Sequence, residues 1–231
     1  MKTGTIIVAA GQGKRFGGKK QFYVIKNKPV FLWSLEKFIP FSDFIVLVLP
    51  KEDIKKTEKI LTRFSHIKKF KEKIKLVAGG KHRYDSVRNG LAHIPKECKI
   101  ICIHDGVRPF VKSGEISDCI SSAKKYGAAI CAIPATDTVK LSTKDGFVDK
   151  TIDRNFVWLV QTPQVFKREI ILKAYKKFGK KIPENITDDS GLVELAGFKV
   201  KIVKGSVSNI KITTKEDVKN PPLSPFMKGG S

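Results

Sequence analysis

Arginine and acidic side chains are both scarce in this chain of 231 residues. Lysine and arginine together number 45 against 22 aspartates and glutamates, which gives a formal net charge of +23, yet only seven of the 45 are arginine. Arginine is the side chain best suited to bidentate contacts with bases and phosphates. No stretch with helical spacing carries a basic stripe interleaved with aromatic residues. The composition therefore argues against a nucleic-acid partner, although the positive field would attract small anionic metabolites.

Cysteine and long apolar runs are also rare. The four cysteines form no C-x-x-C pair, and Cys102 and Cys131 lie in apolar, strand-like runs. All four are interpreted as reduced core residues, namely Cys98, Cys102, Cys119 and Cys131. The first apolar run, residues 6–10, is too short for the core of a signal peptide, and no run approaches transmembrane length. We therefore expect a cytoplasmic protein without a membrane partner.

That first apolar run leads into a stretch rich in glycine and positive charge, TIIVAAGQGKRFGGKKQ. Glycines stand at positions 11, 13, 17 and 18, and the cations between and after them are Lys14, Arg15, Lys19 and Lys20. Glycine lets backbone N–H groups approach an anion without a Cβ in the way, and the cationic side chains add charge beside it. The pattern predicts a buried strand followed by a polyphosphate-binding loop. A solvated, lysine-rich turn is the alternative.

The loop matches neither of two familiar phosphate motifs. A dinucleotide-binding G-x-G-x-x-G beginning at Gly11 would need glycine at position 16, where Phe16 stands. A P-loop nearly fits residues 13–19, but Lys20 follows in place of the serine or threonine whose hydroxyl would contact magnesium. The loop is therefore a third kind of glycine-rich anion site.

Strand and helix patterns alternate through the first 133 residues. Apolar runs predict strands at 44–49, 74–77, 100–103 and 128–133, and helical patterns cover VFLWSLEKF, with Pro29 in its first turn, and residues 51–64. Such alternation is typical of a Rossmann-like α/β fold with a wound, mostly parallel sheet. Ligands bind beyond the carboxyl ends of such strands. The glycine-rich loop, GGKHRYDSVRNGL, HDGVRPFV and PATDTVK should therefore meet at one edge.

Residues 136–156 break the alternation. Their apolar and polar residues alternate weakly around Asp145-Gly146, a residue pair that strongly favours a hairpin turn. Isolated hairpins are marginal in water, so we expect a projecting arm that packs on a second subunit; a floppy insertion is the alternative. Helices at 167–178 and about 188–196, with Thr187 as N-cap, a strand at 199–203 and an extended stretch at 209–213 follow. We expect one domain over 1–219 and a disordered, Pro- and Gly-rich tail at 220–231.

Six stretches, in order from about residue 3 to 217, resemble the 2-C-methyl-D-erythritol 4-phosphate cytidylyltransferases: IIVAAGQGKRFGGKKQF, GGKHRYDSV, HDGVRPFV, TIDRNFVWLVQTPQVF, ITDDSGLVE and NIKITTKED. The resemblance implies a single nucleotidyltransferase domain of the nucleotide-diphospho-sugar transferase type that dimerises through an exchanged hairpin arm. It implies transfer of CMP from CTP to a sugar-alcohol phosphate with release of pyrophosphate, in the non-mevalonate isoprenoid pathway. It also implies Mg²⁺, held mainly by the phosphates of CTP.

The same resemblance assigns roles to individual residues. Arg15 and Lys20 would neutralise the transition state, and Arg154, from the other subunit, and Lys211 would position the attacking phosphate. The positions that match nucleotide contacts are Ala9, Ala10, Gly11, Gly13, Gly80, Ser86, Asp105 and Gly106. Those that match acceptor contacts are Arg108, Asp137, Thr138, Thr162 and Thr187. Asp105 could instead cap its loop, and Arg108 could instead brace the turn at Pro109.

The chemistry fits this reading. The acceptor phosphate is nearly a dianion at neutral pH and CTP carries more negative charge, so positioning and charge neutralisation should dominate. No Ser/His/Asp arrangement offers a nucleophile. His104 is interpreted as structural, because it has one neighbouring aspartate and no second ligand pair. The alternatives are a ribitol-5-phosphate cytidylyltransferase and, more distantly, a non-catalytic basic protein that binds nucleic acid.

The sequence departs from the family pattern at two positions. Gly106 stands where the family often has alanine, and Lys81 stands where an acidic residue is common. Neither change damages the expected chemistry, but Lys81 makes the base-recognition loop more cationic.

Overall fold

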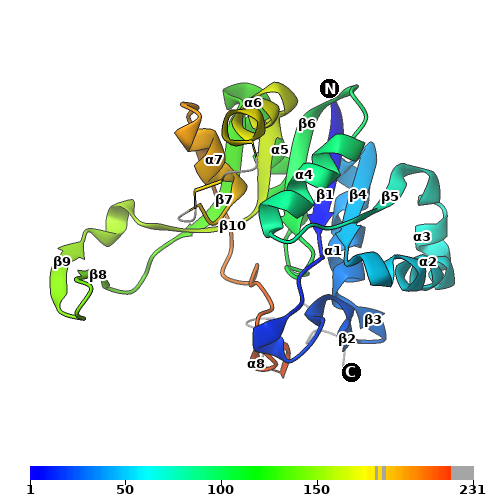
Figure 1. Cartoon of the computed structure of the whole chain (residues 1–231), viewed down its shortest axis with the longest axis horizontal. Helices are drawn as coiled ribbons and strands as arrows, with labels where there is room; N and C mark the ends of the chain where they lie inside the picture. Colours follow the sequence, from blue (N-terminus) through cyan, green and yellow to red (C-terminus); the bar gives the residue numbers. More distant parts are fainter. Residues whose placement is uncertain (180–181, 184–185, 220–231) are drawn as a thin grey trace.

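Seven strands form one sheet in the order β11-β7-β10-β6-β1-β4-β5 (Figure 1). The computed structural model describes residues 1–179, 182–183 and 186–219. Every neighbouring pair is parallel except the two pairs made by β10, which is antiparallel to β6 and β7. The expectation of a mostly parallel α/β sheet is therefore confirmed. The strands are β1 (Lys2–Val8), β4 (Phe44–Leu49), β5 (Ile74–Ala78), β6 (Cys98–Asp105), β7 (Ala128–Pro134), β10 (Trp158–Lys167) and β11 (Lys201–Lys204).

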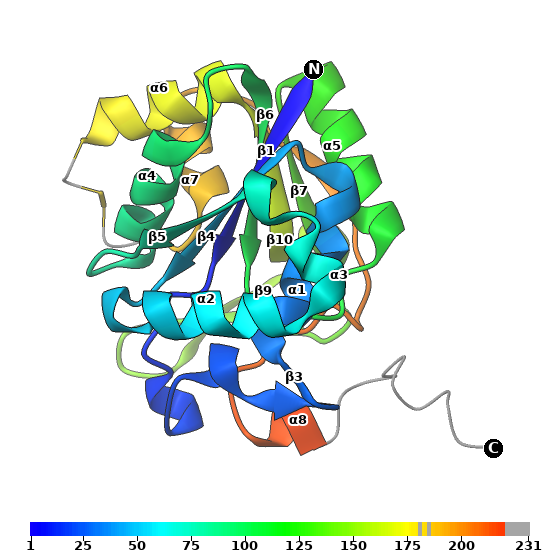
Figure 2. The same ribbon diagram turned by 90° about the vertical axis from the view of Figure 1, so that its right-hand side faces the viewer.

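Helices cover both faces of this sheet (Figure 2). Successive side chains of a strand point to opposite faces, so in β4 Ile45 and Leu47 enter one core and Val46 and Val48 enter the other. The first core is closed by α1 (Val30–Phe38), α2 (Ile54–Arg63), α3 (Ser65–Lys68) and α5 (Ser113–Tyr126). The second is closed by α4 (Arg83–His93), α6 (Arg168–Phe178) and α7 (Asp189–Leu195). A further short helix, α8, spans Glu216–Lys219.

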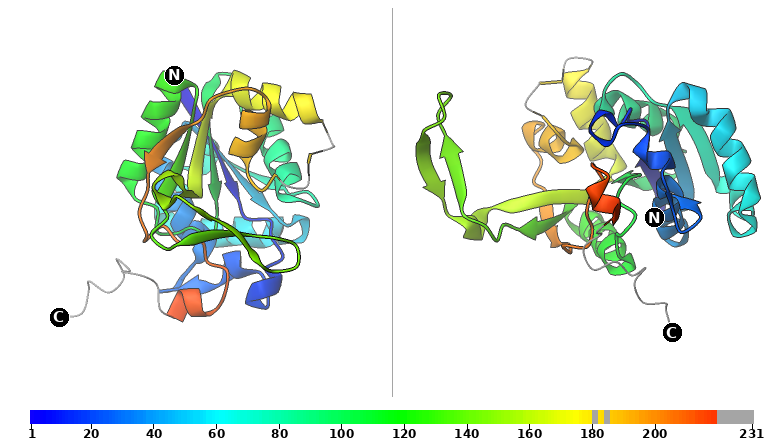
Figure 3. Two further views of the ribbon diagram at one scale, coloured as in Figure 1. Left: turned by 90° about the vertical axis from the view of Figure 1, so that its left-hand side faces the viewer. Right: turned by 90° about the horizontal axis from the view of Figure 1, so that it is seen from below.

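The predicted hairpin is present between β7 and β10. Its strands β8 (Val139–Ser142) and β9 (Val148–Ile152) pair antiparallel, and Gly146 in the turn has φ +93°, as the Asp-Gly pair predicts. Figures 1 and 3 show the hairpin projecting away from the sheet. The chain leaves the sheet at the end of β7 and returns at the same edge, so β10 runs antiparallel to its neighbours without a crossover helix.

Several element predictions need correction. The stretch GGKHRYDSVRNGL, taken as a loop, becomes helix α4 from Arg83 onward, and neither α5 nor strand β10 was predicted. Pro29 does not open α1 but lies just before it, where β3 (Lys28–Pro29) pairs with β2 (Val24–Ile25). Helix α5 has four serines and one glycine among its 14 residues, and both are weaker helix formers than alanine, so packing on the sheet decides its conformation.

The start of α7 also differs by one residue. Asp188, not Thr187, is the N-cap, because its Oδ1 accepts a hydrogen bond from the Gly191 N–H at 3.0 Å. The stretch 209–213 forms no strand, but the Ile212 N–H donates to the Val107 carbonyl at 2.9 Å and so ties it beneath the sheet edge. The short 3-10 turns are Lys14–Phe16, Lys20–Phe22, Ile39–Phe41, Lys51–Asp53, Lys71–Lys73 and Arg154–Phe156.

The four cysteines are buried free thiols, as expected of reduced core residues. Burial raises the pKa of Cys102, which favours the neutral thiol. None of the helices in the described ranges combines the length and the apolar character that crossing a bilayer requires. The disordered tail expected at 220–231 lies outside the described residues.

Candidate active site

Two cavities adjoin at the carboxyl edge of the sheet. One, the loop cavity, has a volume of about 470 Å³ and lies between the glycine-rich loop and the start of α4. The other, the α7 cavity, has a volume of about 320 Å³ and lies between β10 and the start of α7. Arg83, Asp105 and Lys211 line both cavities. These three side chains therefore lie where the two cavities meet.

The glycine-rich loop folds back on itself around Gly13. Its carbonyl accepts the N–H groups of Phe16 at 2.9 Å and Gly18 at 3.3 Å. Gly13 has φ +67°, and a Cβ there would overlap the Gly18 carbonyl oxygen. Phe16 is buried in a small apolar cluster with Val30, Val107, Phe110 and Ile212. The loop is thus anchored by one aromatic side chain and shaped by one glycine.

The two consecutive lysines of this loop lie in different environments. Lys19 pairs with Asp53 at 2.5 Å and Glu52 at 2.8 Å, and these hydrogen bonds raise its pKa. Lys20 lines the loop cavity together with Arg15. Burial, and then the nearby charges of Lys211 and Arg15, lower the pKa of Lys20. Lys19 therefore ties the loop to the turn that follows β4, while Lys20 belongs to a cluster of cations that lines the cavity.

The far end of the loop cavity is built from close backbone contacts. The Gly80 N–H donates to Ser86 Oγ at 3.1 Å, and Ser86 Oγ donates to the His82 carbonyl at 3.3 Å. A Cβ on Gly80 would collide with the Cβ of Asp85. Glycine is required there because the loop passes against the first turn of α4.

Asp105 is the charged centre of the edge. It lies at the end of β6 and accepts Arg83 Nε at 3.2 Å on Oδ1 and Lys211 Nζ at 2.7 Å on Oδ2. Burial alone would raise its pKa, but Arg83, Lys211 and Arg108 together hold the pKa of Asp105 well below its usual range. Asp105 is therefore ionised and positions Lys211 between the two cavities. The alternative expectation was that Asp105 only caps its own loop. Its ion pairs with Arg83 and Lys211 show a further role.

His104 is structural, as predicted. The Asp105 N–H donates to Thr162 Oγ1 at 3.1 Å, and Thr162 Oγ1 lies 2.9 Å from His104 Nδ1. His104 Nε2 lies 3.1 Å from the Arg108 carbonyl. Burial lowers the pKa of His104 to about 3, so the ring is neutral, with Nδ1 accepting from Thr162 and Nε2–H donating to Arg108. Thr162 lines the α7 cavity, yet its hydroxyl is already engaged in this chain of hydrogen bonds.

Arg108 has an unused donor. Its Nη1 donates to the Asn209 carbonyl at 2.7 Å, but its buried Nε has no hydrogen-bond partner among the described residues. The nearest oxygen of Asp105 is 3.9 Å away, too far for a hydrogen bond. A buried unsatisfied donor is costly, and Arg108 lines the α7 cavity. An anion bound there could satisfy it.

Most of the residues selected from the sequence meet at this edge. The loop cavity is lined by Ala9, Ala10, Gly11, Gly13, Arg15, Lys20, Gly80, Ser86, Asp105 and Lys211, and the α7 cavity by Asp105, Arg108, Thr162, Thr187 and Lys211. Gly106 lines neither: its N–H donates to Val8 O at 2.8 Å and its carbonyl accepts from Ser34 Oγ at 3.0 Å.

The arm residues stand apart from both cavities. Asp137, Thr138 and Arg154 are exposed and line neither one. Arg154 Nη1 donates to the Thr136 carbonyl at 2.7 Å, which holds its side chain at the base of the hairpin. Within one chain these residues do not reach the site.

Sequence reasoning missed Arg83, Gln164, Asp188 and Asp189. All four lie within the quoted motifs, and Asp188 and Asp189 were expected only to favour the start of a helix, so none of these side chains was given a role in the site. Gln164 connects β10 to α7, since its Oε1 accepts the Asp189 N–H at 3.1 Å and its Nε2 donates to Asp188 Oδ2 at 2.6 Å. Pairing across distant segments left no local signal in the sequence.

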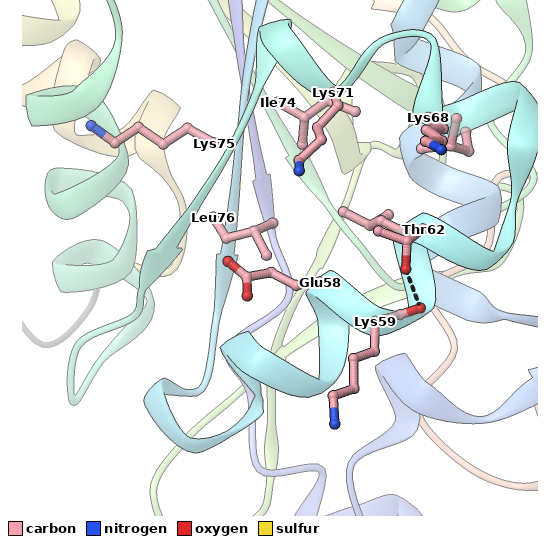
Figure 4. A pocket seen from close by; sticks show the side chains of 10 residues that line it. Glu58, Lys59, Thr62, Lys68, Lys71, Ile74, Lys75 and Leu76 are labelled. Carbon is pink, nitrogen blue, oxygen red and sulfur yellow. Dashed lines mark hydrogen bonds between the residues drawn. The ribbon is translucent and has the colours of Figure 1, made fainter.

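A third cavity, of about 560 Å³, lies beside β5, the last strand at one side of the sheet, between it and the helices α2 and α3 (Figure 4). Leu61, Ile67, Ile74 and Leu76 contribute its apolar lining. Figure 4 shows the side chains of its lysines extending in different directions, with Lys59 and Lys75 pointing away from one another. Its charges do not converge, in contrast to those of the loop cavity.

Comparisons with known proteins agree with the motifs. The model of the family described as 2-C-methyl-D-erythritol 4-phosphate cytidylyltransferase matches residues 4–221. A protein of that name from Clostridium botulinum (strain Loch Maree / Type A3) is 44% identical over 221 residues, 94% of each chain. Another from Caldanaerobacter subterraneus subsp. tengcongensis is 41% identical, over 94% of this chain and 96% of its own. A crystal structure of 4-diphosphocytidyl-2C-methyl-D-erythritol synthase from Anaerococcus prevotii has TM-score 0.82 at 33% identity, over 94% and 93%.

Three alanine substitutions in the glycine-rich loop should separate backbone strain from collision. Gly11→Ala should cause neither strain nor collision. Gly17→Ala would place alanine at a φ of +79° but in open space. Gly13→Ala would combine a φ of +67° with a collision with the Gly18 carbonyl. A left-handed conformation costs a non-glycine residue about 1–2 kcal/mol. Hydrogen exchange at the Phe16 amide should be unchanged in the first variant, faster in the second and fastest in the third. Wild-type protection in Gly13→Ala would contradict this account of the loop.

Proposed function

The chain belongs to the 2-C-methyl-D-erythritol 4-phosphate cytidylyltransferase family, and we propose that its two adjoining cavities bind the two substrates of CMP transfer. It is a cytidylyltransferase of isoprenoid biosynthesis, which joins CTP and 2-C-methyl-D-erythritol 4-phosphate and releases pyrophosphate. The observation that carries the assignment of cavities is the convergence of Arg15, Lys20 and Lys211 around the loop cavity. The triphosphate would lie there and the acceptor phosphate in the α7 cavity.

In this proposal the reaction is a direct displacement. A phosphate oxygen of the acceptor attacks the α-phosphorus of CTP in line with the bond to pyrophosphate, which breaks as the new P–O bond forms. Two anions must approach one another, so catalysis rests on positioning and on charge placed in advance. Arg15 and Lys20 would neutralise the phosphates, because both line the loop cavity and Lys20 is already crowded by other cations.

The rest of the loop cavity suits the nucleoside, and the protein backbone there can contact the phosphates. Ala9, Ala10, Gly11 and Gly13 would offer backbone groups to the nucleotide, and Gly80 and Ser86 would contact the cytosine. Gly106 lines neither cavity, and its N–H already donates to the Val8 carbonyl, so it would stabilise this part of the cavity indirectly.

On the acceptor side, Arg108 and Lys211 would hold the attacking phosphate. The unpaired Nε of Arg108 is a donor that an anion could satisfy, and Lys211 lies between the cavities through its ion pair with Asp105. Thr187 and Thr162 line the same cavity. Because Thr162 already bonds His104 and Asp105, its contribution would be to shape the cavity wall.

The residues present fit a magnesium ion held by the nucleotide. Asp105 is the one carboxylate among the described residues that line the loop cavity, and both of its oxygens already pair with cations. No cluster of three or more potential protein ligands for a metal occurs within the described residues. Phosphate oxygens and water would then supply most of the ligands, which suits an ion that dehydrates reluctantly. When bound, Mg²⁺ would neutralise phosphate charge.

The arm would complete the site of a second subunit. Several apolar side chains of the arm and its base are exposed, among them Phe147 at 69%, Val148 at 63% and Phe156 at 82%, and grouped exposed apolar side chains mark an interaction surface. Arg154, Asp137 and Thr138 lie at the base of the same arm, away from both cavities of their own chain. We therefore propose a homodimer in which Arg154 contacts the acceptor bound by the partner subunit.

The remaining alternatives are weaker. No finding favours ribitol 5-phosphate as acceptor, and membership of an enzyme family argues against a non-catalytic protein. The lysines form an anion site at the sheet edge and otherwise lie scattered along the chain, which supports a small-molecule substrate over nucleic acid. The four buried thiols support a cytoplasmic location, where cysteines stay reduced.

Release of pyrophosphate tests the function directly. Purified protein with CTP and Mg²⁺ should release pyrophosphate with 2-C-methyl-D-erythritol 4-phosphate and much less with ribitol 5-phosphate. Chelation with EDTA should abolish release, and added Mg²⁺ should restore it. Transfer to ribitol 5-phosphate alone would overturn the acceptor assignment, and full activity in EDTA would overturn the magnesium proposal.

The adjacent lysines provide a matched pair of variants. Lys20→Met removes a charge that faces the phosphates, and loss of one such donor typically costs about 10²–10³ in kcat, or roughly 2.7–4 kcal/mol. Lys19→Met removes an ion pair with Glu52 and Asp53 that lies outside the cavities, so its loss of kcat should be under about tenfold. Steady-state kinetics and thermal unfolding would be measured for both. Equal losses in the two variants would show that Lys20 has no special role.

Mixed dimers test the exchange of arms. Lys20→Met and Arg154→Ala should each be strongly impaired alone. If the arm serves the partner, a co-expressed mixture contains heterodimers with one intact site, and random pairing restores about a quarter of wild-type activity. No restoration, in a mixture that gel filtration shows to be dimeric, would place Arg154 in its own subunit's site.

A further inference from the structure

A line of ionic and hydrogen-bonded side chains passes between the two cavities. Tyr175 Oη donates to Asp189 Oδ1 at 2.6 Å, and Asp189 Oδ2 accepts Arg83 Nη1 at 2.6 Å. Arg83 Nε donates to Asp105 Oδ1 at 3.2 Å, and Asp105 Oδ2 pairs with Lys211 at 2.7 Å. We call this line, Tyr175–Asp189–Arg83–Asp105–Lys211, the carboxylate bridge. It joins α6, α7, α4, β6 and the segment that follows β11.

Arg83 is the central link of this bridge. The two carboxylates that it joins come from different sides of the site, and their side chains are only 1% and 8% exposed. Such buried charges need partners with good geometry, and the planar guanidinium offers Nε and Nη donors in a fixed fork. Burial would lower the pKa of Arg83, but Asp189 and Asp105 raise it above its ordinary value. Arg83 therefore stays charged and holds both carboxylates at once.

Each end of the bridge fixes a different part of the site. At one end, Arg83 occupies Asp105 Oδ1 and leaves Oδ2 to hold Lys211. At the other end, Asp189 is the first residue of α7, and its neighbours Thr187, Asp188 and Ser190 line the α7 cavity. Gln164 supports this end by accepting the N–H groups of Asp189 at 3.1 Å and Ser190 at 3.2 Å.

We propose that Arg83 is a positioning residue for CMP transfer: it sets the position of the acceptor cavity relative to the nucleotide cavity by holding Asp189 and Asp105 together. The proposal rests on the proposed function of the two cavities. It requires no direct bond from Arg83 to a reacting atom. A small displacement of α7 or Lys211 would misalign the acceptor oxygen with the α-phosphorus, and misplacement by about 1 Å can cost about 10²-fold in rate.

The nucleotide end of the site should tolerate loss of Arg83. Gly80, Ser86 and His82 hold one another through hydrogen bonds that do not involve the Arg83 side chain. The glycine-rich loop is anchored separately, by Phe16 and by Lys19. A purely structural role for Arg83 would instead lower stability without favouring one substrate over the other.

The test compares Arg83→Met and Arg83→Lys with Arg168→Met. Lysine keeps the charge but has one ammonium nitrogen in place of the separate Nε and Nη1 atoms, so it cannot reproduce both contacts at their present positions. Arg168 also makes two hydrogen bonds between elements, to Pro95 O at 2.9 Å and Ile94 O at 3.2 Å, but at the opposite edge of the sheet. It is a matched control for the loss of a structural arginine.

Both Arg83 variants should lose about 10–100-fold in kcat and in kcat/KM for the acceptor, while the Kd for CTP, measured by calorimetry, changes less than about threefold. Arg168→Met should lower the Tm with kcat within about twofold of wild type. Asp189→Asn should mimic Arg83→Met, and the double variant should be no worse than the worse single one, since both break one link.

Three results would overturn the proposal: normal kcat in the Arg83 variants, loss of CTP binding that parallels the loss of kcat, or independent, multiplying effects in the double variant. If Arg83→Met is too unstable to purify, Arg83→Lys and Asp189→Asn supply the same comparison. Wild-type activity in the same assay is a separate control. An inactive wild type would refute the proposed function itself, whereas an active wild type with unaffected Arg83 variants would refute only this inference.

Discussion

The site depends on keeping the Asp105 carboxylate charged although it is buried. Burial favours the neutral acid, and three cations from three segments, Arg83, Arg108 and Lys211, reverse that preference. Because the carboxylate sits at the end of β6, the central part of the sheet edge, it fixes the cations around it. Loss of that charge would release Lys211 and leave Arg83 with one partner.

Around this anchored carboxylate the protein gathers more positive charge than it neutralises. Lys20, Lys211 and Arg15 lie close enough that two of them lower the pKa of the third. In the proposed function, a bound polyphosphate would relieve the repulsion among them, so part of the attraction for substrate would be built into the free protein. This local excess of positive charge distinguishes the loop cavity from the lysines scattered over the rest of the described chain.

The site residues are held in position by hydrogen bonds and close packing between uncharged groups as much as by ion pairs. The Asp105–Thr162–His104–Arg108 chain uses a neutral imidazole to orient the backbone on which Asp105 lies. Gly13 and Gly80 lie where a Cβ would collide with neighbouring atoms. In the same loop Lys19 is used for attachment and Lys20 faces the cavity, a division that composition could not reveal.

The sequence by itself determined the wound sheet, the hairpin and the glycine-rich loop, because each depends on local signals: apolar runs, Asp145-Gly146, and glycines beside cations. Tertiary structure alone decided which lysine lines the loop cavity, that β10 runs antiparallel, and that Asp188 caps α7. It also decided the carboxylate bridge, since Arg83 and Asp189 lie 106 residues apart. Pairing across such a separation follows from packing, which leaves no periodic mark in the chain.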